Sequence, residues 1–227
     1  MRNSSKRRHS HERVNGRRNT KFFRRAMIFT WKGSFVRARL CVRGFNQVVR
    51  DLDDIYASTP AFSILKLLLL IALSFGLSMV LYDISTAFLH AATTERILVR
   101  PPREFYPDGN VMWLLKRAMY GLRSAPADWQ RHFAEVMSAM GFRRLQTEPN
   151  VYISITILTI IFVHVDDLIL FCRPDRRDDI EQQLKSHFLI KYLANLNDDG
   201  NEAMFLGRLL RRTGDKIAIL MKSDYFD

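Results

Sequence analysis

The sequence predicts an α+β fold in which an antiparallel sheet carries helices on one face, and the order of its apolar segments supports this. A helical run at 61–75 precedes a buried strand that leads into Asp83. An amphipathic helix at 124–141 follows, then two apolar strands that meet at Asp166 and Asp167, and then a further helix. This mixed order of helices and strands is typical of the α+β class. Because 48% of the 227 residues are apolar, the chain can bury a substantial core.

The positive charge of the chain is concentrated in its N-terminal fifth. The net charge is +12, but residues 1–50 contain 15 Lys or Arg and one acid, which gives +14, and the other 177 residues give −2. A polyanion such as nucleic acid is the partner that this distribution favours, whereas a solvated tail is the alternative for residues 1–21. We expect a basic, disordered segment at 1–27 and a folded domain at 28–227.

Turn and cap residues define the expected elements in the first third of the chain. Apolar runs on both sides of 32–34 predict a hairpin, and the polar stretch 47–59 predicts a loop. Thr59 and Pro60 suit the cap and the first turn of the helix at 61–75.

Similar signals define the elements of the remaining chain. Ser124 can cap the amphipathic helix, and Pro126 suits its first turn. Another helix is expected after Pro174, and the C-terminal run 202–223 is expected to form two short strands around Gly214. Further strands are expected at 95–102, 111–121, 150–155, 159–165 and 168–172.

The composition favours an intracellular protein over a secreted or membrane protein. Cys41 and Cys172 lack the spacing of metal ligands, and the basic start is not followed by the apolar segment of a secretory signal. A reducing setting, in the cytoplasm or the nucleus, is therefore expected. The apolar segment 61–81 raises the alternative of a membrane protein. However, its uninterrupted part at 67–81 is shorter than the roughly 20 residues that a span needs.

Two adjacent aspartates, Asp166 and Asp167, stand inside the apolar segment IIFVHVDDLILF. An unpaired carboxylate in apolar surroundings is unfavourable, so such groups usually pair with a cation or bind a metal. Together with Asp83, at the end of another apolar strand, they could converge at one edge of the sheet. A simple polar turn between two strands is the alternative.

Three converging carboxylates would suit a hard divalent ion. Mg²⁺ prefers oxygen ligands, and two such ions about 3.5–4 Å apart can activate an attacking hydroxyl and stabilise a leaving pyrophosphate. Neighbouring residues of a regular strand face opposite sides, a limit that a tight turn relaxes. Asp166 is the expected direct ligand of the adjacent pair.

Several motifs occur in a fixed order along the chain. They are RARLCVRGFNQ (37–47), LYDISTAFLHA (81–91), ILVRPP (97–102), LLKRAMYGLRSAPADW (114–129), GFRRLQTEPNVY (141–152), VHVDDLIL (163–170) and MFLGRLLRR (204–212). In this order and spacing they resemble the reverse transcriptase domain of Ty1/copia-type retrotransposons, over about Phe29 to Tyr225. The most specific part is the combination of YGL-x-x-AP-x-x-W with V-x-V-D-D. The resemblance implies a polymerase palm with partial fingers, and a chain that stops before a thumb.

The resemblance also assigns a metal site. It implies that Asp83 and Asp166 are the principal ligands of two Mg²⁺ ions, with Mn²⁺ as an alternative metal. Asp167 would support these ligands, and the backbone of Ile84 would face the second ion.

A further set of residues would bind the incoming nucleotide. Arg39, with Arg37, matches the basic residue that binds the triphosphate, a task that suits a bidentate guanidinium. Phe88 matches the bulky residue under the incoming sugar. Tyr120 and Gly121 match the start of the segment that packs against nucleotide and template. A solvated hairpin face for the arginines and a core position for Phe88 are the alternatives.

The primer side is matched less closely. His164 stands beside the expected primer end, where the family usually has tyrosine. Lys191 falls where a family lysine can act as general acid toward the pyrophosphate. Phe205, Leu206 and Gly207 match the primer-grip region.

The function that the resemblance implies is an RNA-directed DNA polymerase domain. A primer 3′-hydroxyl would attack the α-phosphate of a dNTP, with an RNA or DNA template-primer as partner. Other domains of a Gag-Pol-type polyprotein are further expected partners, and no membrane partner is expected. The alternative is a catalytically inactive nucleic-acid-binding remnant, because His164 replaces the usual tyrosine and the expected thumb is missing. The segment YLANL and the short fingers segment FTWKGSF also depart from the family pattern.

Overall fold

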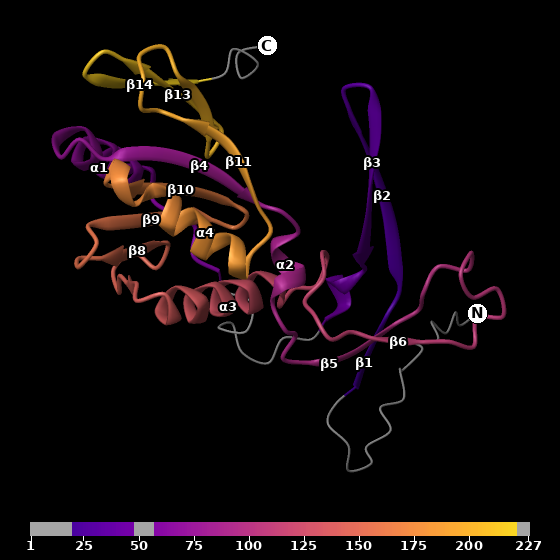
Figure 1. Ribbon diagram of the computed structural model, residues 1–227. Coiled ribbons are helices and arrows are strands. Elements are labelled where there is room, and N and C mark those ends of the chain that lie inside the picture. Colours follow the sequence, from indigo (N-terminus) through magenta and orange to yellow (C-terminus); the bar gives the residue numbers. More distant parts are fainter. Residues whose placement is uncertain (1–19, 48–56, 222–227) are drawn as a thin grey trace, which may run out of the picture.

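A six-stranded antiparallel sheet forms the centre of the protein (Figure 1). The computed structural model describes residues 20–47 and 57–221. The central sheet has the strand order β11-β4-β10-β9-β8-β7, and each neighbouring pair is antiparallel. Its strands are β4 (Ser78–Ile84), β7 (Arg143–Arg144), β8 (Val151–Ser154), β9 (Thr159–His164), β10 (Asp167–Cys172) and β11 (Ile190–Asn195). The α+β class is confirmed, and the strand that contains Asp83 lies beside the one that begins at Asp167.

Alternate residues of the central strands enter two separate cores. The helical elements are α1 (Phe62–Ser74), α2 (Ala87–His90), α3 (Ala125–Ala139), α4 (Arg177–His187) and the short 3-10 turns η1 (Gly44–Asn46) and η3 (Pro174–Arg176). Tyr82 and Leu168 pack on one face with α3 and α4. Leu81 and Ile169 pack on the other face with α1. Because both faces are covered, β4 is buried at every position except Asp83. The expectation that helices lie on one face only is wrong for α1.

A small three-stranded sheet packs on the same face as α1. It consists of β12 (Glu202–Phe205), β13 (Arg208–Thr213) and β14 (Lys216–Met221), and its inward side chains join the α1 core. The two strands expected here are therefore three. The additional turn is at Leu206 and Gly207, whose φ angles of +49° and +72° are those of a tight two-residue hairpin loop. Strand β11 was likewise not expected from the sequence.

The N-terminal strands form a hairpin that projects from the rest of the protein (Figure 1). The strands of this region are β1 (Thr20–Phe23), β2 (Arg25–Lys32), β3 (Phe35–Val42), β5 (Arg96–Val99) and β6 (Trp113–Leu114). The β2–β3 hairpin turns at Gly33, as expected. Strand β5 pairs with both β1 and β6. Since β6 contains Trp113 and Leu114 alone, only part of the expected strand 111–121 forms. Residues 20–23 and 25–27, which were expected in a disordered segment, lie in β1 and β2.

Two motif segments are hydrogen-bonded to each other where the β2–β3 hairpin meets the segment before α3. The Val42 N–H donates to the Tyr120 carbonyl (2.7 Å), and the Gly44 N–H donates to the Gly121 carbonyl (3.1 Å). Gly121 has a φ of +89°, and a Cβ atom there would lie 2.0 Å from the Val42 carbonyl oxygen. A glycine is therefore required at position 121 by both conformation and space.

Gln47 lies buried at the centre of this junction, with 2% of its surface exposed. Its Nε2 donates to Glu95 Oε2 (2.6 Å) and to Ser124 Oγ (3.2 Å), and its Oε1 accepts from the Arg123 N–H (2.7 Å). Ser124 precedes α3 as expected but makes no side-chain cap, because its hydroxyl faces Gln47 instead. The amide thus joins the segment after the hairpin to the start of α3.

Replacing Gln47 with methionine should lower the free energy of unfolding by about 2–3 kcal/mol. The reason is that the Arg123 N–H, Glu95 Oε2 and Ser124 Oγ lose a hydrogen-bond partner. Urea denaturation measures the change. Gln182→Met, on the exposed side of α4, is the control and should change stability by less than about 0.5 kcal/mol. If both variants are as stable as the native chain, the amide does not hold this junction.

Two further expectations concern the region before α1. Helix α1 begins at Phe62 with Ala61 as its N-cap and has no side-chain cap, so Thr59 and Pro60 lie before the helix. Most of the loop expected at 47–59 lies outside the described residues. Among the helices of the described part of the chain, none is long and apolar enough to cross a membrane.

Candidate active site

The turn between β9 and β10 presents the adjacent aspartates. His164 pairs with Asp167, which leaves Val165 and Asp166 as a two-residue loop. Val165 has a φ of +55°, a left-handed conformation that is a genuine outlier for a β-branched residue. The Ile84 N–H donates to the Asp166 carbonyl (2.7 Å), so β4 fixes the position of the loop.

Four polar residues form a row across the end of the central sheet. In order across β11, β4, β10 and β9 they are Lys191, Asp83, Asp167 and His164, each in register with the next. Residues directly opposite one another in antiparallel strands project from the same face. The strand pairing therefore places Asp83 and Asp167 side by side, with Asp166 adjacent in the loop. The register thus pairs Asp83 with Asp167, and Asp166 precedes Asp167 in the chain.

The carboxylates of this row influence one another. Burial, together with the negative charges of Asp166 and Asp83, raises the pKa of Asp167 to about 6. The Ser85 hydroxyl donates to Asp83 Oδ2 (3.1 Å). Burial also lowers the pKa of His164, whose Nδ1 is buried without a hydrogen-bond partner. The aspartates form a cluster of negative charge that the neighbouring side chains do not fully neutralise.

The donor chemistry of this cluster suits a hard divalent cation. Carboxylate oxygens are preferred ligands of Mg²⁺, and a bound cation would relieve the repulsion felt by Asp167. Within residues 20–47 and 57–221, no group of three His, Cys, Asp or Glu side chains converges as a metal site. The residues therefore fit a divalent ion chemically, but a closed three-ligand cage is not preformed.

The residues expected to bind a nucleotide lie beside the aspartates. The Tyr120 ring is 4.9 Å from the Phe88 ring, and the Arg39 guanidinium lies 5.5 Å from the centroid of Tyr120. Burial raises the pKa of Tyr120, Asp166 and Asp83 also raise it, and Arg39 and Arg37 lower it. Residues of β3, α2 and the segment before α3 therefore meet at the aspartate edge.

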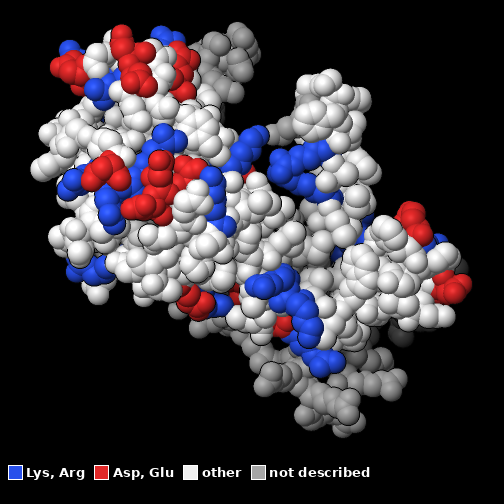
Figure 2. All heavy atoms as spheres, in the orientation of Figure 1, with Lys and Arg blue, Asp and Glu red and all other residues white. Residues whose placement is uncertain are grey.

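The β2–β3 hairpin carries positive charge on the side that faces the main body. Figure 2 shows Lys and Arg side chains on the side of the hairpin that faces the main body. Arg37 and Arg39 lie on the same strand two residues apart, so they project from one face of β3. A negatively charged ligand beside Tyr120 would lie between this basic face and the carboxylate cluster.

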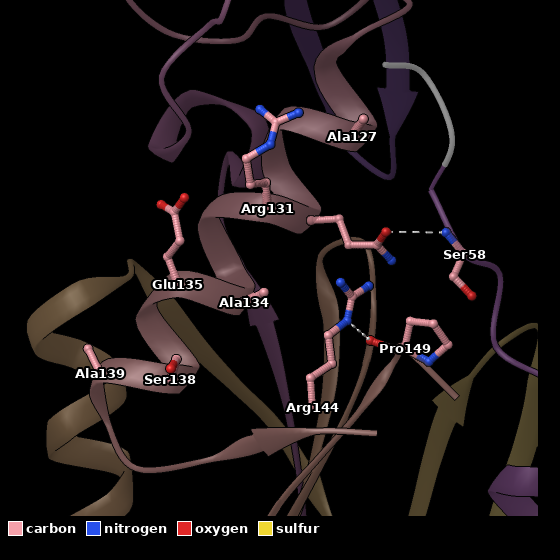
Figure 3. Close-up of a pocket in the computed structure, with 10 residues that line it drawn as sticks. Ser58, Ala127, Arg131, Ala134, Glu135, Ser138, Ala139, Arg144 and Pro149 are labelled. Carbon is pink, nitrogen blue, oxygen red and sulfur yellow. Dashed lines mark hydrogen bonds between the residues drawn. The ribbon is translucent and has the colours of Figure 1, made fainter. Parts of the chain in front are cut away.

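A wide groove of about 910 Å³ lies elsewhere, on the outer side of α3 (Figure 3). The Arg144 Nε–H donates to the Pro149 carbonyl (2.7 Å), and Arg131 pairs with the buried Asp128 (3.1 Å). Both cations are thus engaged within the protein, and none of the three clustered aspartates lines the groove. The groove is separate from the candidate active site.

Comparison with known families decides the identity of the fold. Residues 14–225 match the family described as reverse transcriptase (RNA-dependent DNA polymerase). The chain belongs to this reverse transcriptase family. The motif match noted in the sequence is thereby confirmed.

Curated relatives place this reverse transcriptase domain among transposon polyproteins. It is 30% identical over 140 residues to the retrovirus-related Pol polyprotein from transposon TNT 1-94 of Nicotiana tabacum, covering 59% of this chain and 10% of that protein. It is 31% identical over 148 residues to a putative transposon Ty5-1 protein of Saccharomyces cerevisiae, covering 63% of this chain and 46% of that protein. The resemblance to Ty1/copia-type elements is confirmed. The chain spans less than half the length of each relative.

One solved structure similar to this reverse transcriptase domain is apo telomerase from Candida tropicalis truncated from its C-terminal domain. The TM-score is 0.42 at 10% sequence identity, and the alignment covers 86% of this chain and 55% of that chain.

The reverse transcriptase residues expected on the primer side occupy different environments. Lys191 is exposed, in register with Asp83 across β11 and β4. Phe205 is buried, and its ring lies 5.7 Å from Phe162. Within the expected primer-grip segment, a ligand could therefore reach the turn at Leu206 and Gly207 more readily than the Phe205 ring.

Two residues near the site were not predicted from the sequence. Trp129 is a buried residue of α3 whose indole N–H donates to the Val165 carbonyl (2.7 Å). Gln47 carried no assignment, although it is the amide that joins the hairpin to α3. Both stand inside the recognised motifs, which was the available signal, but the acceptor of a buried donor becomes known only from the tertiary structure.

Proposed function

We propose that this chain provides the polymerase site of a copia-type RNA-directed DNA polymerase, which transfers dNMP from a dNTP to a primer 3′-hydroxyl. The observation that carries this proposal is the register of β4 and β10, which puts Asp83 beside Asp167, with Asp166 in the adjoining loop. The family match supports a polymerase-type enzyme. The carboxylates of β4 and β10, with the basic hairpin nearby, fit a reaction between two phosphate-bearing substrates.

The aspartates are proposed to hold two divalent ions. Asp83 and Asp166 would be the principal ligands, Asp167 would support them, and the backbone of Ile84 would lie near the second ion. When bound, Mg²⁺ or Mn²⁺ supplies charge neutralisation and Lewis acidity at the reacting phosphate. Without metal, burial and the neighbouring charges of Asp166 and Asp83 raise the pKa of Asp167 to about 6.

The basic hairpin and the Tyr120 segment are proposed to position the incoming dNTP. Arg39 would bind the triphosphate through its guanidinium fork, with Arg37 beside it. The ring contacts among Arg39, Tyr120 and Phe88 hold these side chains together and leave the guanidinium at the edge of the site. Phe88 would lie under the sugar, and Gly121 would let the backbone approach the nucleotide and template.

The primer would lie on the side of His164 and the turn at Leu206 and Gly207. Lys191, in register with Asp83, is proposed as the general acid for the leaving pyrophosphate. The partners proposed for the chain are an RNA or DNA template-primer and the other parts of a Pol-type polyprotein, inside the cell. The names of the relatives support the last of these proposals.

Primer extension with varied dNTP concentration tests the nucleotide role of Arg39. Arg39→Lys should raise KM for dNTP about tenfold with a smaller change in kcat, because one charge-assisted hydrogen bond is lost. Arg143→Lys, on exposed β7 at the far edge of the sheet, is the matched control. An unchanged KM in Arg39→Lys would show that this residue does not bind the triphosphate.

A catalytically inactive nucleic-acid-binding remnant is the second candidate function. Two observations favour it, namely His164 at the place of the usual tyrosine and the absence of a preformed three-group metal cage among the described residues. Salt-sensitive binding of a template-primer, with no incorporation at any Mg²⁺ or Mn²⁺ concentration, would support this candidate over the polymerase.

A further inference from the structure

The turn that presents Asp166 is conformationally strained. Val165 adopts a φ of +55° in a two-residue loop, at a position where glycine is favoured. A β-branched residue in this region is disfavoured by about 1–3 kcal/mol and persists only where surrounding contacts enforce it. The contacts that enforce it therefore determine where the Asp166 carboxylate lies.

Trp129 supplies one of these contacts from a different element. Its Nε1–H, on the first half of α3, donates to the Val165 carbonyl at 2.7 Å. On the other side, the Ile84 N–H of β4 donates to the Asp166 carbonyl at the same distance. Two consecutive carbonyls of the loop are thus held from two directions. The peptide group held by Trp129 is the one that carries the Asp166 nitrogen.

The Trp129 side chain is itself held firmly. It is 3% exposed, and its ring lies 5.5 Å from both Phe133 and Phe188 and 6.2 Å from His90. Such packing fixes the direction of the indole N–H, and a buried indole N–H requires an acceptor. Phenylalanine could fill much of this space but could not donate the hydrogen bond.

We propose that Trp129 is a positioning residue for the catalytic turn. Its indole N–H holds the Val165 carbonyl and thereby keeps Asp166 beside Asp83 and Asp167. This inference rests on the proposed function, because it concerns the carboxylates that would bind the metal. Groups that orient metal ligands from behind typically affect metal affinity or activity by about 10–100-fold when removed.

Replacing Trp129 with benzothienylalanine in the full chain tests the hydrogen bond directly, since sulfur then replaces the N–H in a ring of nearly the same shape. Mn²⁺ binding is measured by electron paramagnetic resonance, with Asp166→Asn as the blank that defines the site. The expected result is Mn²⁺ affinity about tenfold weaker or more. In primer extension, kcat should fall by a similar factor, with KM for dNTP within about twofold of native.

Met137→Ala is the matched control, because it weakens the buried packing of α3 about two turns beyond Trp129 and does not change the rings that pack on the indole. It should lower the unfolding temperature and leave Mn²⁺ affinity and kcat near native values. Native Mn²⁺ affinity and kcat in the benzothienylalanine chain would overturn the proposal and leave Trp129 as a core residue.

Failure of the proposed function gives a different pattern. A native chain that binds Mn²⁺ at the aspartates but does not extend a primer would refute the polymerase alone, and the affinity comparison would still decide the role of Trp129. If the native chain binds no Mn²⁺, the amide NMR signals of residues 165–167 decide. Shifted or broadened signals in the benzothienylalanine chain would support the positioning role, and unchanged signals would overturn it.

Discussion

Gly121→Ala should lower the free energy of unfolding by about 3–5 kcal/mol, because it combines left-handed backbone strain with overpacking against a backbone atom. The added Cβ would lie 2.0 Å from the Val42 carbonyl oxygen, and Gly121 has a φ of +89°. Hydrogen bonds join Val42 and Gly44 to the 120–121 segment, so the two segments cannot move apart to admit the Cβ atom without breaking them. Urea denaturation at equilibrium measures the loss.

Gly141→Ala separates the two causes. Gly141 ends α3 with a φ of +82°, but a Cβ there would meet no atom within 4 Å. It should therefore show the conformational strain alone, at about 1 kcal/mol. If the two variants lose the same stability, the close contact between the two motif segments is not what requires glycine at position 121.

The second large effect concerns activity. Asp83→Asn should reduce dNTP incorporation by more than about 100-fold, since even residues that only support a metal ligand can reach that factor. The variant should be at least as stable as the native chain, because the Asp83 charge raises the pKa of Asp167 through repulsion. Primer extension and thermal unfolding on the same preparation measure both quantities.

Asp175→Asn is the charge-matched control for this variant. Asp175 is exposed and pairs with the exposed Arg173, so its removal should leave incorporation near the native level. Loss of activity in both variants, or an unfolded Asp83→Asn chain, would mean that the effect is not specific to the carboxylate cluster.

The sequence predicted the α+β class, the strand that leads into Asp83 and the hairpin at Asp166 and Asp167. These features depend on local apolar pattern and on motifs, which a single sequence contains. The sequence did not predict strand β11, whose pairing with β4 is irregular between Tyr192 and Ala194. Nor did it predict that Lys191 would lie opposite Asp83, because register between strands distant in the chain is a tertiary property.

The sequence indicated candidate site residues but not how they are arranged. The ring contacts of Tyr120 with Phe88 and Arg39 depend on how the hairpin docks, and that docking depends on buried Gln47 and on two glycine contacts. Helix α1 was expected on the same face as the other helices for a related reason. An apolar helix can cover either side of a sheet that is apolar on both faces.

The most direct test of the proposed function is Mg²⁺-dependent dNTP incorporation on a poly(rA)/oligo(dT) template-primer, comparing the native chain with Asp166→Asn. The account predicts incorporation that requires Mg²⁺ or Mn²⁺ in the native chain and disappears in the variant. Equal incorporation by both chains, or none by the native chain despite tight template-primer binding, would contradict the proposal that the three aspartates form a polymerase site.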